Sequence, residues 1–76
     1  MASLTTSLNT DFTPAAGDFN VQVTGGRAGL VRKNNSGAAF ALVGSLNSGD
    51  AVIVSNPIAG AVYQVQGAGV TIAVDQ

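Results

Sequence analysis

Short clusters of glycine, asparagine, serine and proline interrupt this chain at intervals of about 10–12 residues, which is the spacing of turns in a small sandwich or barrel. Glycine adopts positive φ at little steric cost, and asparagine and aspartate bond their own backbone, so such clusters favour turns. Glutamate is absent, and lysine, arginine and leucine are sparse, which leaves few strong helix formers. The clusters lie at residues 25–26, 34–37, 47–50, 56–60 and 67–69.

Between the clusters, apolar residues alternate with polar ones, which is the period of a strand that buries one face. Phe19, Val21 and Val23 carry this pattern most clearly. We predict an all-β fold, a small antiparallel β-sandwich or barrel of immunoglobulin-like type, with residues 25–26 as a two-residue hairpin turn. Six strands are expected, at residues 19–24, 27–33, 39–43, 51–54, 62–65 and 70–74, and a seventh if residues 3–10 form one more.

The first residues of the chain differ from the rest. Residues 18–76 are predicted to form a single domain, and residues 1–17 an extended N-terminal arm. Pro14 favours extended backbone in the residue before it, and Leu4 and Leu8 are the main aliphatic anchors of the segment. We expect the arm to add a strand to a neighbouring subunit or to a larger shell.

The core of such a domain must be thin, because the hydrophobic 46% of the chain is mostly alanine and valine. A chain of 76 residues is marginal as an isolated fold, and without cysteine it cannot gain disulfides. We therefore expect a closed homo-oligomer, with a trimer slightly ahead of a dimer. The predicted core residues are Phe19, Val21, Leu30, Phe40, Leu42, Ile53, Tyr63 and Val65.

Few side chains can carry chemistry. The chain has four aspartates, three lysine or arginine residues, and no histidine, cysteine or tryptophan. Catalysis usually needs histidine, cysteine or convergent carboxylates, and zinc and haem take mainly histidine or cysteine ligands. We therefore predict that the protein is not an enzyme, with no catalytic, cofactor-binding or metal-binding residues and no cofactor. A net charge of −1 argues against a nucleic-acid partner, and no apolar run approaches the length of a bilayer span.

Two groups of residues could nevertheless have a functional role, and each also has a structural interpretation. Asp18, Asn20 and residues 47–50 offer oxygen ligands that calcium could use, but without the dense spacing of a calcium loop, and turns are the stronger interpretation. Arg27, Arg32 and Lys33 could meet an acidic partner. We favour the alternatives that these charges protect an edge hairpin from pairing with other strands, or are simply solvated.

The glycines and aromatic residues also have structural interpretations. The glycines fall between strands and lack the lysine of a phosphate-binding loop, so turns are expected. A sugar-stacking platform would need exposed aromatics, whereas Phe19, Phe40 and Tyr63 are expected in the core. Phe12, in the loop before Pro14, is the aromatic residue expected to reach outwards or into a neighbour.

Ten positions define a recurrent order of strands, turns and aromatic residues in this chain: Phe19, Val21, Gly25, Leu30, Arg32, Gly37, Phe40, Val43, Gly60 and Tyr63. This order resembles small β-sandwich proteins encoded among the virion genes of tailed bacteriophages. Those proteins often have tryptophan where this chain has Phe40. The resemblance covers about three-quarters of the chain and implies a protein that decorates or cements a capsid, or that sits on head fibres or tails, commonly as an oligomer.

The resemblance and the composition together lead to one functional expectation. We expect a structural virion protein of a tailed phage, made in the host cytoplasm and located on the capsid surface. Its partner would be the major capsid protein or another virion lattice, held by many weak contacts. The alternative is a glycan-binding or host-binding module on a tail or head fibre, followed by a host-encoded adhesive domain.

Overall fold

The computed structural model describes residues 3–4, 6–33, 39–57 and 59–76, and these form an all-β fold in two sheets. Five strands lie within two residues of the segments expected from the alternation of the sequence, and the third lies two to three residues further along the chain than expected. All neighbouring strands are antiparallel. The predicted fold class, a small antiparallel β-sandwich, is confirmed. The strands are β1 (Gly17–Thr24), β2 (Ala28–Lys33), β3 (Ala41–Leu46), β4 (Ala51–Asn56), β5 (Val62–Gln66) and β6 (Thr71–Asp75).

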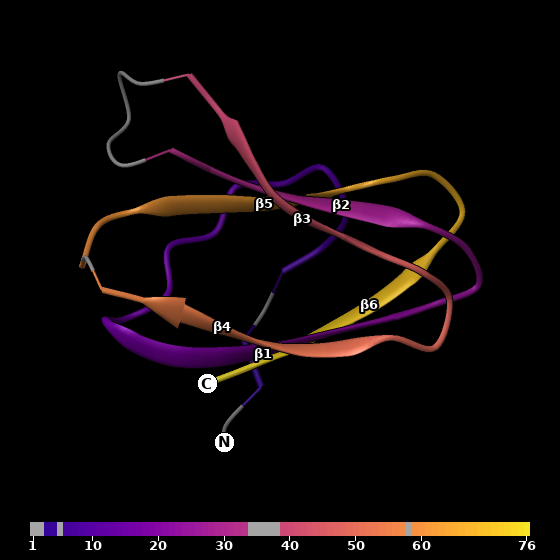
Figure 1. The fold of residues 1–76 in the computed structure, drawn as a ribbon, viewed down its shortest axis with the longest axis horizontal. Helices are drawn as coiled ribbons and strands as arrows, with labels where there is room; N and C mark the ends of the chain where they lie inside the picture. The colour runs from indigo at the N-terminus through magenta and orange to yellow at the C-terminus, as the bar shows by residue number, and fades with distance from the viewer. Residues whose placement is uncertain (1–2, 5, 34–38, 58) are drawn as a thin grey trace.

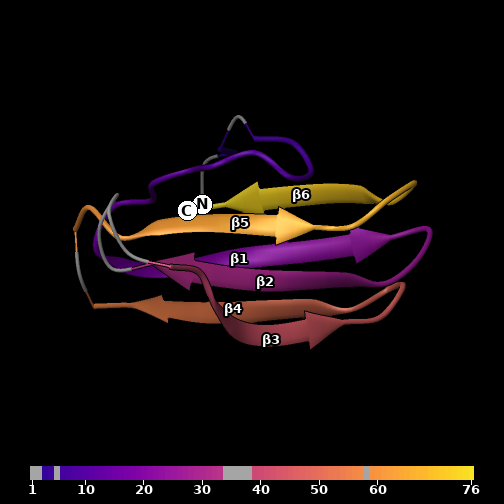
Figure 2. The same cartoon turned by 90° about the horizontal axis from the view of Figure 1, so that it is seen from above.

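The two sheets face each other as the layers of a sandwich (Figure 1). One sheet has the strand order β4-β1-β6 and the other β3-β2-β5. Seen from above, β4 lies with β3 at one side, β1 with β2 in the middle, and β6 with β5 at the other side (Figure 2). The chain therefore changes sheet after β1, β3, β4 and β5.

This topology corrects the predicted hairpin at Gly25-Gly26. β1 and β2 belong to different sheets, so these glycines carry the chain from one layer to the other instead of joining two paired strands. Gly25 has φ of +91°, but Gly26 does not have the positive φ that a type I′ hairpin turn requires at both positions. The turn at residues 34–37 lies outside the described residues.

The connections at this end of the sandwich pack against one another. Val23 exchanges backbone hydrogen bonds with the β3–β4 turn, and the amide of Gly25 donates to the hydroxyl of Ser48 at 3.1 Å. On the other side, a Cβ on Gly26 would lie 2.7 Å from Cγ1 of Val70, which follows β5. A side chain at residue 26 would therefore require Val70 to move, because the two connections approach so closely.

The core lies between the sheets and includes most of the predicted residues. Phe19, Val21, Leu30, Tyr63 and Val65 are buried, which confirms five of the expected positions. They share the core with residues that the alternation left unassigned, chiefly Phe12, Val23, Ala28, Leu46, Val54, Ala61, Val70 and Val74.

Three predicted core residues are not buried. Ile53 is 62% exposed because it pairs with Asn20 on the outer face of its sheet, while Val54 and Val52 pair with inward-facing Phe19 and Val21. Leu42 is 69% exposed, and Phe40 is half-buried with its ring 4.6 Å from Nζ of Lys33.

A β-bulge explains the position of Leu42. Alternation from buried Leu46 would place residues 44 and 42 on the inner face. The register shifts between Leu30, which pairs with Gly44, and Val31, which pairs with Leu42, so Val43 is an extra residue on β3. The extra residue moves Leu42 to the outer face, where it lies beside Gly29.

Residues of the predicted arm run along the β5/β6 side of the sandwich (Figure 2). The amide of Leu4 donates to the carbonyl of Val74 at 2.7 Å, and Phe12 exchanges backbone bonds with Tyr63 at 2.8 and 2.9 Å. The expectation that Phe12 reaches outwards is wrong, because its side chain belongs to the core. A further full strand is not seen in the described part of residues 3–10, which makes one isolated bridge. The domain boundary after residue 17 stays a prediction.

Candidate interaction site

One side of the sandwich, formed by β3 and β4, exposes apolar side chains. We call this surface the β3/β4 edge. β3 and β4 are the outer strands of their sheets, and each has one neighbouring strand among the described residues. The large hydrophobic side chains that stand exposed in the described part of the chain all lie here, at Leu42, Val43, Val52 and Ile53. Proteins usually protect such edges with charge, yet neither β3 nor β4 contains a charged residue.

A groove of about 310 Å³ opens between the two sheets at this edge. Val43, Val52 and Ile53 lie along it, and Leu30, Leu46 and Val54 supply its buried apolar lining. The volume is roughly ten times the ~30 Å³ share of one water molecule, which is room for an aliphatic side chain.

Gly44 is the residue that leaves the groove open. It pairs with inward-facing Leu30, so a side chain at this position would point between the sheets. A Cβ built on Gly44 meets nothing within 4 Å, and its φ is not positive, so its backbone does not require glycine. The groove thus follows from one missing side chain and from the bulge at Val43.

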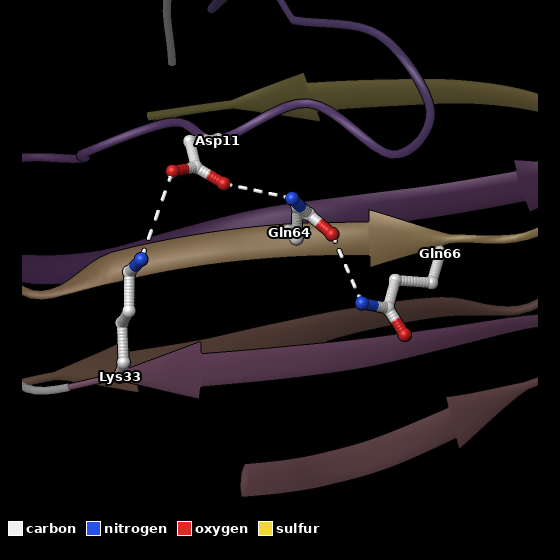
Figure 3. Close-up of polar contacts among 4 residues, drawn as sticks. All are labelled: Asp11, Lys33, Gln64 and Gln66. Atoms are coloured by element: carbon white, nitrogen blue, oxygen red, sulfur yellow. Dashed lines mark hydrogen bonds and ion pairs between the residues drawn. The ribbon is translucent and has the colours of Figure 1, made fainter. Parts of the chain in front are cut away.

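The opposite side of the sandwich is covered. Near β5, Asp11 accepts a hydrogen bond from Nε2 of Gln64 at 2.7 Å, and Gln64 accepts one from Gln66 at 2.9 Å (Figure 3). The second carboxylate oxygen of Asp11 lies 3.9 Å from Nζ of Lys33. Because Asp11 is half exposed, this ion pair adds little stability, and the N-terminal segment is held mainly by backbone bonds and by Phe12.

Beneath the N-terminal segment, three aromatic rings form a cluster. Phe19 packs edge-on against Tyr63 with ring centroids 4.9 Å apart, and Phe12 lies 5.9 and 6.0 Å from these two rings. Such edge-to-face pairs stabilise beyond the area they bury. With Phe40 half-buried beside Lys33, the four aromatic residues of this chain form no exposed platform for a sugar ring.

Asn56 connects this cluster to the N-terminal segment, and sequence reasoning missed its role. It is 1% exposed, and its Oδ1 accepts a hydrogen bond from the hydroxyl of Tyr63 at 3.1 Å. Its Nδ2 donates to the carbonyl of Ala15 at 2.9 Å. The signal was the alternation from Val54, which places residue 56 on the inner face, but the following Pro57 suggested a turn.

Replacing Asn56 with alanine should destabilise the fold by about 1–3 kcal/mol, because the buried Tyr63 hydroxyl would lose its partner. Chemical denaturation at one protein concentration measures the change. The double variant Asn56→Ala/Tyr63→Phe should lose less free energy of unfolding than the sum of the losses in the two single variants. If the two losses simply add, Asn56 and Tyr63 are not coupled.

The predicted basic group does not gather into a patch. Arg27 lies before β2 and donates to Oδ1 of Asn47 at 3.0 Å, whereas Lys33 ends β2 next to Asp11. The two residues are six positions apart along extended chain, which is about 20 Å. Edge protection is also wrong for these charges, because β2 is the central strand of its sheet. The exposed side chain of Arg27 agrees with the solvation alternative.

The possible calcium ligands are placed as turn and strand residues. Asp50 Oδ2 accepts a hydrogen bond from the amide of Asn47 at 2.7 Å, which closes the turn before β4. Asp18 and Asn20 lie on β1, where they pair with Ser55 and Ile53 of β4 and not with the turn at residues 47–50. In the described residues no three acidic, histidine or cysteine side chains gather where they could hold a metal ion.

The chain was also compared with known proteins. It matches no family model, no curated protein and no solved structure at a significant level. Within the described residues, no helix is long and apolar enough to cross a membrane.

Proposed function

We propose that this protein is a structural virion protein of a tailed phage, a capsid decoration or cement protein that stabilises a head by multivalent surface contacts. The observation that carries the proposal is the β3/β4 edge, where four large apolar side chains stand exposed on two uncharged strands. An apolar patch of this kind on a small domain marks an interaction surface. The resemblance of the strand and turn pattern to phage sandwich proteins supports a phage virion as the assembly that this surface contacts.

The glycan-binding alternative has less support from the geometry. Sugar recognition by stacking needs an exposed aromatic face, and Phe12, Phe19 and Tyr63 are packed into one buried cluster. Phe40 lies under the ammonium group of Lys33. Assembly by apolar and backbone contacts fits the surface better.

The protein is expected to co-sediment with purified tailed-phage heads from which decoration protein has been stripped. Because the β3/β4 edge carries no charge, binding should weaken by less than about tenfold between about 50 and about 200 mM salt. Heads carrying the protein should release DNA at a higher temperature, since a ligand stabilises the state that it binds.

Two results would count against this proposal. Stripped heads that neither bind the protein nor gain heat resistance would exclude the cement role for those heads. A clear signal on a glycan array, lost on replacing Phe40 with alanine, would support the alternative instead.

A further inference from the structure

The outer face of the sheet β3-β2-β5 has a hollow of about 400 Å³ at Gly29, which we call the Gly29 hollow. Leu30 faces the core, so the neighbouring Gly29 faces outwards. Gly29 pairs with Ser45 on β3 and with Gln66 on β5, so one row of three residues crosses the sheet here. Neighbouring strands lie about 4.8 Å apart, and the hollow is therefore about 10 Å wide between the backbones of β3 and β5.

The backbone does not require glycine at the centre of this row. The φ of Gly29 is not positive, and a Cβ there would meet only Cδ1 of Leu42, at 3.8 Å, which is an ordinary contact. Glycine within a strand weakens the strand and often marks a place where a ligand approaches closely. The missing side chain leaves room for a group from outside.

The Gly29 hollow is closed along β2 and therefore suits one inserted side chain. Arg27 and Val31 stand two residues before and two residues after Gly29, on the same side of the chain. Arg27 lines the hollow, and its Nε donates to Oδ1 of Asn47 at 3.0 Å, which orients the guanidinium group. A main chain lying along β2 would meet Arg27 and Val31, whereas a single side chain entering from above would pass between them.

A chain of hydrogen bonds determines which atom Gln66 presents to the hollow that it lines (Figure 3). A carboxylate only accepts hydrogen bonds, so Asp11 takes the NH2 group of Gln64, at 2.7 Å. The oxygen of Gln64 then accepts from Nε2 of Gln66, at 2.9 Å. Gln66 extends from β5 towards β2 with its Oε1 turned away from Gln64. The hollow therefore meets a hydrogen-bond acceptor on its β5 side.

Donors and an acceptor thus line different sides of the Gly29 hollow. The guanidinium group of Arg27 and the hydroxyl of Ser45 can donate, while Oε1 of Gln66 can only accept. A carboxamide offers a carbonyl oxygen to the donors and an N–H to the acceptor. A carboxylate would place an oxygen against Oε1 of Gln66, and its charge gains little beside an exposed arginine.

We infer that the Gly29 hollow binds the side-chain carboxamide of a glutamine or asparagine on a protein partner, and that Asp11 sets this preference through Gln64 and Gln66. Arg27, Ser45 and Gln66 contact the carboxamide, whereas Asp11 is a positioning residue. The inference goes beyond the proposed function, because it concerns the outer face of a sheet and not the β3/β4 edge.

Two capped amino acids test the inference on the full-length chain, without phage heads. The probes are N-acetylglutamine N-methylamide and its carboxylate counterpart, N-acetylglutamate N-methylamide, and NMR titration follows the backbone amides of Gly29 and Ser45. The glutamine probe should bind with a dissociation constant of about 1–100 mM, the range for a few exposed hydrogen bonds, and at least about fivefold more tightly than the glutamate probe. Equal affinities, or no saturable shift with the glutamine probe, would overturn the inference.

Arg27→Gln and Gln66→Leu each remove one contact. Both residues are exposed, so both variants should fold with an unchanged circular dichroism spectrum. Each should weaken binding of the glutamine probe by at least about fivefold, as expected for the loss of one hydrogen bond. Gln22→Leu is the matched control, because it makes the same change at an exposed position of the other sheet and should leave binding unchanged. Equal affinities in all three variants would overturn the inference.

Asp11→Ala tests the positioning role. Without the carboxylate, the amides of Gln64 and Gln66 can turn, and Gln66 can donate to a carboxylate in the hollow. The preference for the glutamine probe should fall below about twofold or reverse. Asp18→Ala removes the same charge from β1, in the other sheet, and should keep the preference. An unchanged preference in Asp11→Ala, or tighter binding of methyl glucoside than of the glutamine probe, would overturn the inference.

Discussion

Replacing Phe19 with alanine should remove a large part of the protein's free energy of unfolding. Phe19 is fully buried and contacts both Tyr63 and Phe12, so its removal should cost about 3–5 kcal/mol. A domain of 76 residues has about 4–11 kcal/mol of stability in total, at about 0.05–0.15 kcal/mol per residue. The loss is therefore a large part of the whole.

Urea unfolding followed by far-UV circular dichroism measures this change. All variants should be compared at one protein concentration, because association shifts apparent stability. Phe40→Ala is the matched control, since it removes the same ring from a half-buried position beside Lys33 and should cost distinctly less. Equal unfolding midpoints for the two variants would show that the aromatic cluster is not the centre of the core.

The sequence allowed the strands to be located because turn residues and alternation act locally. Phe19, Val21 and Tyr63 were correctly assigned to the core, since each stands in a segment with a clear period of two. The assignment failed at Ile53, where four consecutive apolar residues leave the inward phase undefined. It failed at Leu42 because a bulge reverses the phase and is not visible in the sequence.

The arrangement of strands into sheets was less predictable. A glycine pair between two strands fits a hairpin as well as a connection between layers, and the close contact between Gly26 and Val70 that distinguishes them involves residues far apart in sequence. The candidate site depends on the same long-range information. Exposure at Val43 and Val52 arises from the position of β3 and β4 at the ends of their sheets, which local patterns do not specify.

Phe12 and Asn56 illustrate the same limit for individual residues. Phe12 stands in a segment whose proline and small residues indicate a loop, yet its ring completes the aromatic cluster. Asn56 looks like a turn residue before Pro57 but is buried, because the Tyr63 hydroxyl and the Ala15 carbonyl satisfy it. Both depend on partners that the chain brings together only on folding.

Removal of residues 1–10 and removal of residues 1–13 should have very different effects. The shorter deletion loses the apolar contacts of Leu4 and Leu8 but keeps Phe12, so the domain should remain folded with reduced stability. The longer deletion also removes Phe12, which pairs with Tyr63 and packs on Phe19. It should cost a further 3–5 kcal/mol, about the value for a buried phenylalanine, and leave the chain largely unfolded.

Thermal and urea unfolding of both truncated chains, beside full-length Phe12→Ala, measures these differences. Full-length Phe12→Ala should reproduce most of the difference in stability between the two deletions, because the ring and not the chain length is responsible.

The shorter deletion also bares part of the β5/β6 edge, whose backbone groups Leu4 and Asn9 otherwise occupy. That edge can then pair with a β3/β4 edge, so sedimentation should show larger species than the full-length chain forms at the same concentration. A folded, stable chain after the longer deletion would instead show that residues 1–13 lie outside the folded domain, because residues 14–76 would then suffice for the fold.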